Sequence, residues 1–413
     1  MTADTLITSP DHRARLDREA ARLLAFGAGA ARPGRVGAAY LDADGHPDPA
    51  RGTLTWITCR TVHSYALGHL LGRPGCAAVA EAALAGLTGP LHDARDGGWF
   101  HSVDESGTPE VTAGKSAYDH AFVMLAGASA TTAGLRGGAD LLAVATSTYL
   151  ERFWDDVHGR PVDTWDVAFT DLDGYRGLNA TMHSVEAMLA VASAVPPEES
   201  GAWLDRAARA ASFVVDLART HDGRLPEHFD ADWVPDLELN ADRPDDPFKP
   251  YGATPGHGLE WARLLLHLEA MTARSQELLD TATVLFDRAA ADAWAVDGAD
   301  GFVYTTDWSG APVVRTRMHW VATEAIAAAA ALYERTGDTR FADRYATWWD
   351  YAERHLVDER KGSWHHELDT ANRPAATVWP GKPDVYHALQ CTLIPRLPLA
   401  PMVAGALRDG ALR

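Results

Sequence analysis

Apolar residues recur along the chain with the 3.6-residue spacing of amphipathic helices, in segments rich in alanine and leucine. These segments predict helices at 11–26, 59–72, 76–88, 115–133, 138–153, 177–194, 200–219, 257–272, 276–294, 318–335, 339–355 and 384–396. Short runs of Pro, Gly and Asp separate many of them, as in "GRPG" at 72–75 and "RTGDTR" at 335–340. No segment has the pattern of a parallel strand between helices, so we predict an all-α protein built from helical hairpins.

The long connections between these hairpins carry a second repeat. It reads "GGWFHSVDESGTP" at 97–109, "DGFVYTTDWSGAP" at 300–312 and "KGSWHHELDTANRP" at 361–374. Each copy has aromatic residues, then Asp-x-x-Gly or Asp-x-x-Asn, then Pro, which is typical of a short β-hairpin closed by a tight turn. We expect each connection to form a small strand pair, with Trp99, Trp308 and Trp364 serving in its packing.

Six helical hairpins follow one another at intervals of about 55 to 80 residues, which is longer than the repeat unit of common open solenoids. An open solenoid also needs distinct capping repeats at its ends, and the sequence shows none. A closed ring of six hairpins, an (α/α)6 barrel, accommodates this number better. We therefore predict an (α/α)6 barrel with short β-hairpins in its long connections, as one domain over residues 1–413.

The two helices of each hairpin differ in composition. Helices starting near 138, 200, 276 and 339 have an ordinary amphipathic pattern, as in "DRAARAASFVVDLART", which is typical of an outer ring. Helices starting near 59, 115, 177, 257, 318 and 384 carry polar and aromatic residues in their first two turns, as in "GHGLEWARLL" and "DVYHALQC". These helices are predicted to form the inner ring, with the same end of each at one mouth.

Such a ring would bring its first-turn side chains together in one cavity. The residues predicted to line it are Arg60, Tyr118, Asn179, His183, Glu186, His257, Glu260, His319, Trp320, Glu324, Trp379 and His387. Polar groups bind hydroxyls and tryptophans offer stacking faces, so the set is typical of a sugar site. The carboxylates could instead serve only as partners of the helix dipoles.

Composition and charge narrow the classes of partner. The chain is 46% hydrophobic and 23% charged, as globular proteins are, and its formal net charge of -20 repels phosphate backbones and anionic lipids. We expect no nucleic-acid or membrane partner. No signal segment or long apolar run is present, which predicts a soluble, cytoplasmic protein. Cys59, Cys76 and Cys391 are predicted to be buried and reduced, and the sequence leaves the oligomeric state open.

His183 with Glu186, and His257 with Glu260, both have the spacing that places two side chains on one helix face. Histidines and carboxylates can hold metal ions, but the zinc motif HExxH is absent, and di-metal bundles use Glu-x-x-His in the opposite order. We therefore expect no metal and no cofactor.

Several of these segments together resemble the N-acylglucosamine 2-epimerase superfamily, and most of all its aldose–ketose isomerase branch. They are "RTVHSYALG", "KSAYDHAF", "GLNATMHSVEA", "YGATPGHGLEWARLL" and "GKPDVYHALQ", and the resemblance extends from about residue 11 to 396. It implies an (α/α)6 barrel and cofactor-free isomerisation through a cis-enediol. It also implies that the sugar pocket is lined by Arg60, Tyr118, Asn179, His183, His257, Glu260, Glu324, Trp379 and His387.

Within this resemblance, histidines meet the need for an acid and a base without a metal. We expect His387 to move the proton between C2 and C1, and His257, oriented by Glu260, to act in ring opening and at the oxygens. Arg60 and His183 would bind the enediol oxygens. D-mannose and D-fructose are the expected pair, with D-lyxose and D-xylulose as a lesser one.

Four alternatives stay open. A sulfoquinovose isomerase would need a cationic pocket wall, for which Arg243, Lys249 and Lys382 are candidates, with Lys382 carried as a binding residue. A 2-epimerase acting on cellobiose would use the same histidines. A glycoside hydrolase would use two of Glu186, Glu260 and Glu324. A sugar-binding module would bind without turnover.

The Pro- and Asp-rich connection at 220–256 is predicted to cover the substrate as a lid.

Overall fold

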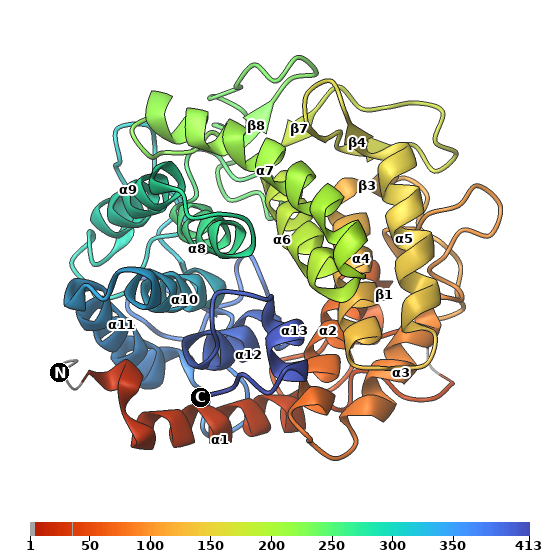
Figure 1. Cartoon of the computed structure of the whole chain (residues 1–413), viewed down its shortest axis with the longest axis horizontal. Coiled ribbons are helices and arrows are strands. Elements are labelled where there is room, and N and C mark those ends of the chain that lie inside the picture. Colours follow the sequence, from red (N-terminus) through yellow and green to blue (C-terminus); the bar gives the residue numbers. More distant parts are fainter. Residues whose placement is uncertain (1–4, 35) are drawn as a thin grey trace.

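The computed structural model describes residues 5–34 and 36–413, and its long helices form two concentric rings (Figure 1). The inner ring consists of α2 (Thr55–Leu70), α4 (Ala117–Thr132), α6 (Leu178–Ala194), α8 (Pro255–Met271), α10 (His319–Thr336) and α12 (Tyr386–Leu393). The outer ring consists of α1 (Pro10–Gly27), α3 (Cys76–Leu87), α5 (Gly138–Arg152), α7 (Pro197–Thr220), α9 (Gln276–Ala293) and α11 (Thr339–Tyr351). Each inner helix contacts the next, and α12 contacts α2, so the ring is closed. The predicted (α/α)6 barrel is confirmed.

The sequence explains which helices lie inside. Inner helices are buried on almost every face, and α10 carries an uninterrupted buried run from Ala325 to Leu332 whose small side chains let neighbouring helices approach. Outer helices bury one face only, as α11 does through Phe341, Tyr345 and Trp348. The helix bounds agree closely with the predicted ranges, except that α12 is shorter and α11 ends in a π turn, Ala352–Leu356.

The predicted turns in the long connections are present, and three more accompany them. Antiparallel bridges close the expected turns at Val103↔Pro109, Thr306↔Pro312 and Leu368↔Pro374, and further ones close Leu41↔Pro47, Trp165↔Leu172 and Phe229↔Pro235. An aspartate opens each of these turns, and its carboxylate accepts backbone N–H bonds within the turn, as Asp104 does from Ser106 and Thr108. The barrel therefore repeats this turn once in each of its six units.

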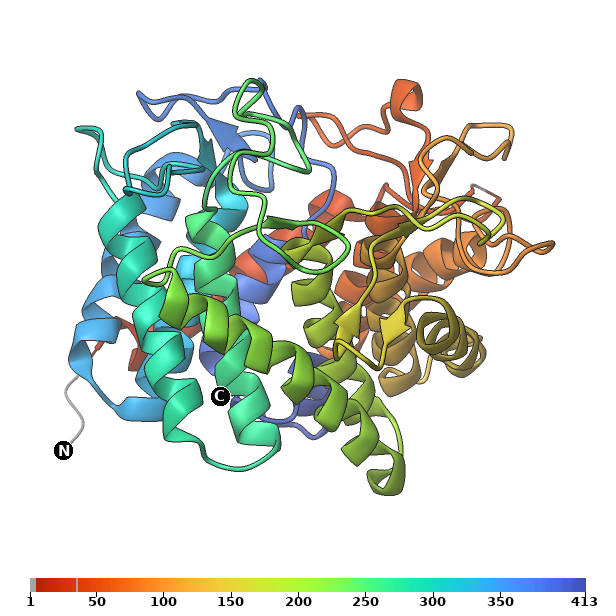
Figure 2. The same ribbon diagram turned by 90° about the horizontal axis from the view of Figure 1, so that it is seen from above.

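Two-residue strands join four of the six turns to an inner helix. β1 (Thr53–Leu54) pairs with β2 (Ser102–Val103), β3 (Lys115–Ser116) with β6 (Thr164–Trp165), β7 (Arg176–Gly177) with β8 (His228–Phe229), and β9 (Arg317–Met318) with β10 (Glu367–Leu368), all antiparallel. A fifth pair, β4 (Trp154–Asp155) with β5 (Arg160–Pro161), forms a separate ribbon. In the side view, this rim of strands and turns gathers on the side where the inner helices begin (Figure 2).

The other end of the barrel is covered by the C-terminal segment, which includes α13 (Val403–Arg408) packed against α2, α4 and α6. Short 3-10 turns occur at Leu6–Thr8, Pro49–Arg51 and Ile394–Arg396. Trp99 and Trp364 are buried, as their predicted packing role requires, and the three cysteines are buried and free. Over the described residues, no helix combines the length and apolar character that a membrane span needs.

Candidate active site

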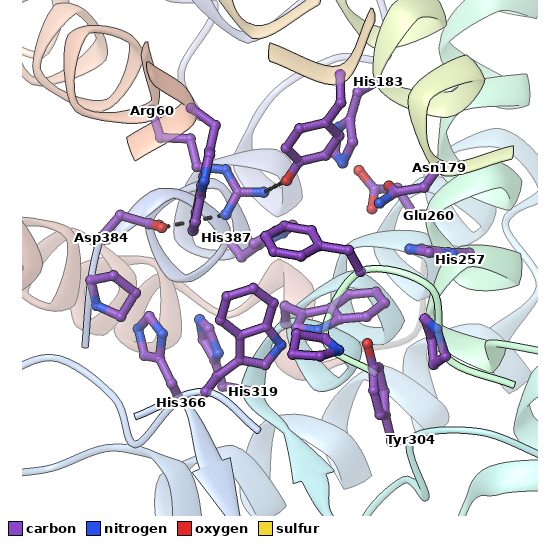
Figure 3. Close-up of a pocket in the computed structure, with 18 residues that line it drawn as sticks. Arg60, Asn179, His183, His257, Glu260, Tyr304, His319, His366, Asp384 and His387 are labelled. Carbon is purple, nitrogen blue, oxygen red and sulfur yellow. Dashed lines mark hydrogen bonds and ion pairs between the residues drawn. The ribbon is translucent and has the colours of Figure 1, made fainter. Parts of the chain in front are cut away.

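A cavity of about 760 Å³, including its open mouth, lies where the inner helices begin (Figure 3). It is lined by Trp56, Arg60, Tyr118, Asn179, His183, Pro247, Phe248, Pro250, His257, Glu260, Tyr304, His319, Trp320, His366, Trp379, Pro383, Asp384 and His387. Ten of these were predicted from the sequence. Glu186 and Glu324 lie beneath the cavity floor instead, and Lys382 lies outside it.

His257 stands in the first turn of α8, which begins at Pro255. Its Nδ1 lies 2.9 Å from Oε1 of the buried Glu227, although their alignment is not that of an ideal hydrogen bond. Glu260 was expected to orient His257, and that prediction was wrong: Glu227, from the connection before β8, takes this place. Nothing in the spacing of Glu227 and His257 along the chain signals their contact.

Trp320 separates His257 from the second histidine, His387. The Trp320 ring lies 5.1 Å from the His257 ring and 6.0 Å from the His387 ring, measured between centroids. This position depends on Gly256, because a Cβ there would stand 2.5 Å from the Trp320 ring. The Pro-Gly start of α8 therefore lets the indole lie against the backbone between two imidazoles.

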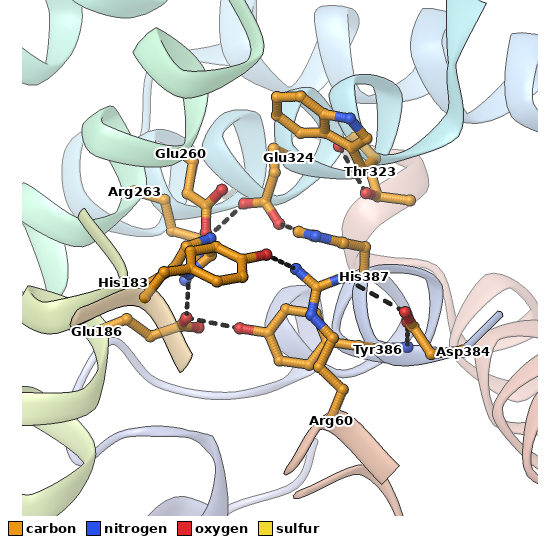
Figure 4. A network of polar contacts seen from close by, with 12 residues as sticks. Arg60, His183, Glu186, Glu260, Arg263, Thr323, Glu324, Asp384, Tyr386 and His387 are labelled. Atoms are coloured by element: carbon orange, nitrogen blue, oxygen red, sulfur yellow. Dashed lines mark hydrogen bonds and ion pairs between the residues drawn. The ribbon is translucent and has the colours of Figure 1, made fainter. Parts of the chain in front are cut away.

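His387 is backed by a carboxylate from the neighbouring helix (Figure 4). Its Nδ1 lies 3.0 Å from Oε1 of Glu324, and the other oxygen of Glu324 accepts a bond from Arg263 Nε at 2.9 Å. Burial lowers the pKa of His387, so the imidazole is neutral near pH 7. Because Nδ1 donates its proton to a carboxylate, Nε2 carries the free lone pair.

His183 has a similar partner on its own helix. Its Nδ1 lies 3.2 Å from Oε2 of Glu186, which also accepts a bond from the Tyr386 hydroxyl at 2.6 Å. Burial lowers the pKa of His183 to about 4. The predicted pairing of His183 with Glu186 is therefore present, with Glu186 holding the histidine from below the cavity.

Arg60 is the cation nearest the cavity. Its guanidinium donates to Asp384 Oδ2 at 3.3 Å and to the Tyr118 hydroxyl at 3.2 Å. The rings of Trp56, Phe122 and Tyr386 surround it at 4.7 to 4.8 Å from their centroids. These contacts hold the planar guanidinium in one orientation, which suits it to binding adjacent oxygens. Asp384 was not predicted, although it stands within the "GKPDVYHALQ" segment.

Aromatic and imidazole rings build the remaining walls. Trp379 meets Trp56 edge-on at 6.1 Å and Phe248 at 5.3 Å, and the rings of His319 and His366 stack at 3.7 Å. Glu367 holds the backbone around Trp379 by accepting its N–H at 2.9 Å. Of these, Trp56, Phe248 and His366 were missed. Trp56 lies in the first turn of α2, ahead of the predicted start of that helix, whereas Phe248 and His366 come from connections whose path over the cavity only the folded chain defines.

The connection that carries Phe248 lies on the side of the barrel where the inner helices begin (Figure 2), and its residues Pro247, Phe248 and Pro250 line the cavity. Asp246 accepts bonds from the N–H groups of Phe248 and Lys249, at 3.0 and 2.9 Å. Its far end is held by a 2.8 Å bond between His228 Nε2 and the Pro250 carbonyl. These contacts place part of the predicted lid over the site, and its movement stays a prediction.

Among the described residues, Arg60 is the one cation that lines the cavity, and it is already engaged, so they form no cationic wall of the kind that a sulfonate would need. Lys382 was predicted to bind substrate, and the structure contradicts this, because its buried Nζ donates to Asp358 Oδ2 and to the Gly362 carbonyl, both at 2.7 Å. Lys249 Nζ lies 3.6 Å from the centroid of the Tyr175 ring, and Arg243 bonds to Asn240. Neither lines the cavity.

Among the described residues, one group could hold a metal ion by distance alone: ligand atoms of His183, Glu186 and Glu260 lie within 4.8 Å of one another. Arg263 Nη2 lies 3.3 Å from Glu260, so a fixed cation already stands beside this group. Oε2 of Glu186 also accepts bonds from His183 and Tyr386. This donor set does not fit a metal ion, because a fixed cation and other donors already occupy its oxygens.

The barrel and its cavity define the class of the protein: an (α/α)6-barrel enzyme whose histidines, arginine and aromatic walls suit a small polyhydroxylated substrate. Comparisons with known proteins are more specific. The family model described as N-acylglucosamine 2-epimerase (GlcNAc 2-epimerase) matches residues 37–391. The chain belongs to this family, and it is an isomerase.

Relatives and a solved structure extend this comparison. A D-mannose isomerase of Thermobifida fusca is 50% identical over 399 residues, which cover 96% of this chain and 97% of the relative. One of Pseudomonas cannabina pv. alisalensis is 42% identical over 98% of both chains. A crystal structure of a D-mannose isomerase aligns with a TM-score of 0.86 at 26% identity, over 93% of this chain and 97% of that one.

Proposed function

We propose that the protein interconverts D-mannose and D-fructose through a cis-enediol, with no cofactor, and D-lyxose and D-xylulose as a lesser pair. The observation that carries the proposal is the pair His257 and His387, each beside a buried carboxylate and placed on either side of Trp320. The names of the relatives at 50% and 42% identity support mannose as the substrate.

In this proposal His387 is the base that moves the carbon-bound proton. Its neutral Nε2 removes the proton from C2, the C–H electron pair forms the C1=C2 double bond, and the carbonyl pair moves to O1. The same imidazolium then returns its proton to C1, the O2–H proton passes to O1, and the electron pair left on O2 forms the C2=O2 carbonyl of the ketose. Glu324, held by Arg263, keeps Nδ1 protonated so that Nε2 can serve this role.

His257 serves at the oxygens. With Glu227 beside Nδ1, it takes the proton of the anomeric hydroxyl and delivers one to the ring oxygen, which opens the sugar. Arg60 and His183 bind the two oxygens of the enediol, where negative charge develops. The first turns of α6 and α8 direct their N–H groups and dipoles to the same region.

The cavity also supports a neutral monosaccharide over the alternatives. A sulfonate would find Arg60 already paired with Asp384, and no lysine of residues 5–34 and 36–413 lines the cavity. The second sugar of cellobiose would meet the aromatic wall of Phe248 and Trp379. A hydrolase needs two carboxyl groups facing the substrate, and of the three glutamates only Glu260 lines the cavity.

Proton NMR of the metal-stripped protein with D-mannose in deuterium oxide tests the proposal. The expected result is fructose that carries deuterium at C1, because the proton held by the His387 imidazolium exchanges with the solvent before transfer to C1. Glucose as the main product would instead indicate a 2-epimerase. If mannose does not change, the proposal is wrong, and sulfoquinovose and cellobiose are the substrates to test next.

Variants assign the roles of the histidines. His257→Ala and His387→Ala are each expected to reduce turnover at least about a hundredfold, the size of a lost general acid or base. His69→Ala, at an exposed histidine of α2, is the matched control and should keep the wild-type rate. A variant of His257 or His387 that keeps most of its rate would remove that residue from the mechanism.

A further inference from the structure

Three buried glutamates converge on one guanidinium beneath and beside the cavity (Figure 4). Glu186 comes from α6, Glu260 from α8 and Glu324 from α10, and each is about 1% exposed. Arg263 is fully buried among them and donates to Glu324 at 2.9 Å and to Glu260 at 3.3 Å. If all three carboxyl groups were ionised, their charge would exceed that of Arg263 by two in a region without solvent. A burial of this kind is costly unless protons neutralise part of the charge.

The other cation nearby does not correct this excess. Arg60 is paired with Asp384, whose carboxylate offsets the charge of the guanidinium. His183 and His387 are neutral near pH 7, because burial lowers the pKa of both imidazoles, so they offer N–H bonds but no positive charge. At least one carboxyl group of the cluster must therefore carry a proton in the resting protein.

The contacts show which carboxyl group this is. Glu324 receives N–H bonds from Arg263 and His387, and Glu186 receives bonds from His183 and the Tyr386 hydroxyl. Four donors therefore stabilise the ionised form of these two groups. Glu260 has a single long contact, 3.3 Å to Arg263. Glu260 is also the member of the cluster that lines the cavity.

Charged and titratable groups face Glu260 from every inner helix. They are Arg60 on α2, Tyr118 on α4, His183 and Glu186 on α6, Arg263 on α8, Glu324 on α10, and Tyr386 and His387 on α12. Burial raises the pKa of Glu260 well above its usual range, and the charge of Glu324 raises it further. Burial by itself would raise the pKa of Glu324, but the charge of Arg263 and the bond from His387 outweigh it and lower this pKa.

We propose that Glu260 is the un-ionised carboxylic acid of this cluster in the resting enzyme, and that its O–H group donates a hydrogen bond to the oxygen anion that develops on the sugar. The second half of this proposal rests on the proposed isomerase function. A neutral acid in a dry site is a strong donor and brings no charge of its own that would repel the enediolate. Glu260 is thus a catalytic residue, in a role different from the predicted orientation of His257.

Infrared spectroscopy tests the protonation state without any substrate. At pH 7 the wild-type protein is expected to show the carbonyl stretch of an un-ionised carboxyl group, and Glu260→Gln should lose it. Glu105→Gln, at an exposed glutamate, is the control and should keep the band. If the glutamine variant does not fold, Glu260→Asp replaces it in the test. This variant keeps a carboxylic acid and should show the band at a shifted frequency. The proposal is overturned if the wild type lacks the band or if the band survives in Glu260→Gln.

Kinetics test the donor role. The amide of Glu260→Gln keeps an uncharged donor, so we expect turnover to fall by only about tenfold with a nearly unchanged KM, whereas Glu260→Ala should lose at least about a hundredfold. Equal losses in both variants would overturn the donor role. A protein that shows the Glu260 band but converts no mannose would contradict the proposed function and leave the protonation state of Glu260 standing.

Discussion

His257 Nδ1 and Glu227 Oε1 lie 2.9 Å apart, although the two residues belong to different elements and 29 positions of sequence lie between them. Glu227 precedes β8, and His257 stands in the first turn of α8. The contact fixes which ring nitrogen of His257 faces the carboxylate, and therefore which one faces the cavity.

Replacing this carboxylate with an amide tests its role. Glu227→Gln should lower kcat at least about tenfold with little change in KM, because an amide can donate to Nδ1 and so favour the wrong tautomer of His257. Steady-state kinetics with mannose and the pH profile of kcat would measure this. Glu238→Gln, at an exposed glutamate of the same connection, is the control. A wild-type rate in Glu227→Gln would show that His257 needs no orienting carboxylate.

Lys382 provides a second test, since the structure makes it a structural residue. Lys382→Met leaves Asp358 buried without its 2.7 Å partner, and removal of one member of a buried ion pair costs about 3 to 5 kcal/mol of unfolding free energy. Urea unfolding would measure the loss, and KM for the sugar should be unchanged in the folded variant. Lys361→Met removes only an exposed ion pair and should cost far less. A large rise in KM for Lys382→Met would instead show that this lysine contributes to substrate binding.

Stability should fall as the solution is acidified below about pH 6.5. Burial lowers the pKa of His12, His63, His120 and His267 to about 4. Between pH 6.5 and 4 the unfolded chain binds protons at these residues and the folded chain does not. Each histidine therefore removes about 1.4 kcal/mol of unfolding free energy per pH unit over this interval.

His120 is the best single probe of this effect. Its Nδ1 donates to the Ser116 carbonyl at 2.7 Å and its Nε2 accepts the Trp99 N–H at 3.1 Å, so protonation would abolish the second bond. In His120→Gln, urea unfolding over a series of pH values should show a shallower loss below pH 6.5 than in the wild type. An unchanged slope would mean that His120 does not contribute to acid sensitivity.

Phe248 is predicted to restrict the substrate to monosaccharides. The residue is 47% exposed, yet it lines the cavity, and its ring centroid lies 5.3 Å from that of Trp379. Phe248→Ala should raise kcat/KM for a 4-O-linked mannobiose relative to mannose by at least about tenfold, because the ring that a second sugar would strike is removed. Val234→Ala, at an exposed residue of the same connection, should leave the ratio unchanged. An unchanged ratio in Phe248→Ala would place the size limit elsewhere.

The turns of the rim show which parts of the structure a local sequence pattern can predict. Three were predicted because Gly107, Gly310 and Asn372 stand at the position with positive φ, where glycine and asparagine are favoured. The turns with Phe169 and Trp233 at that position, at φ values of 57° and 62°, have no such signal. Trp233 is held there by packing against Phe213 and Phe229, which no local pattern reveals.

The two His-x-x-Glu pairs separate sequence from tertiary structure most clearly. Helical periodicity by itself determined the helices and the shared face of each pair, because both depend only on residues within one or two turns of one another. His183 contacts Glu186, as its helix spacing predicts. His257 instead contacts Glu227, and Glu260 accepts a bond from Arg263. Which partner each group takes depends on what neighbouring helices bring to it. Only the tertiary structure decides these pairings, because a buried charge must be stabilised by the donors nearest in space, whichever element they come from.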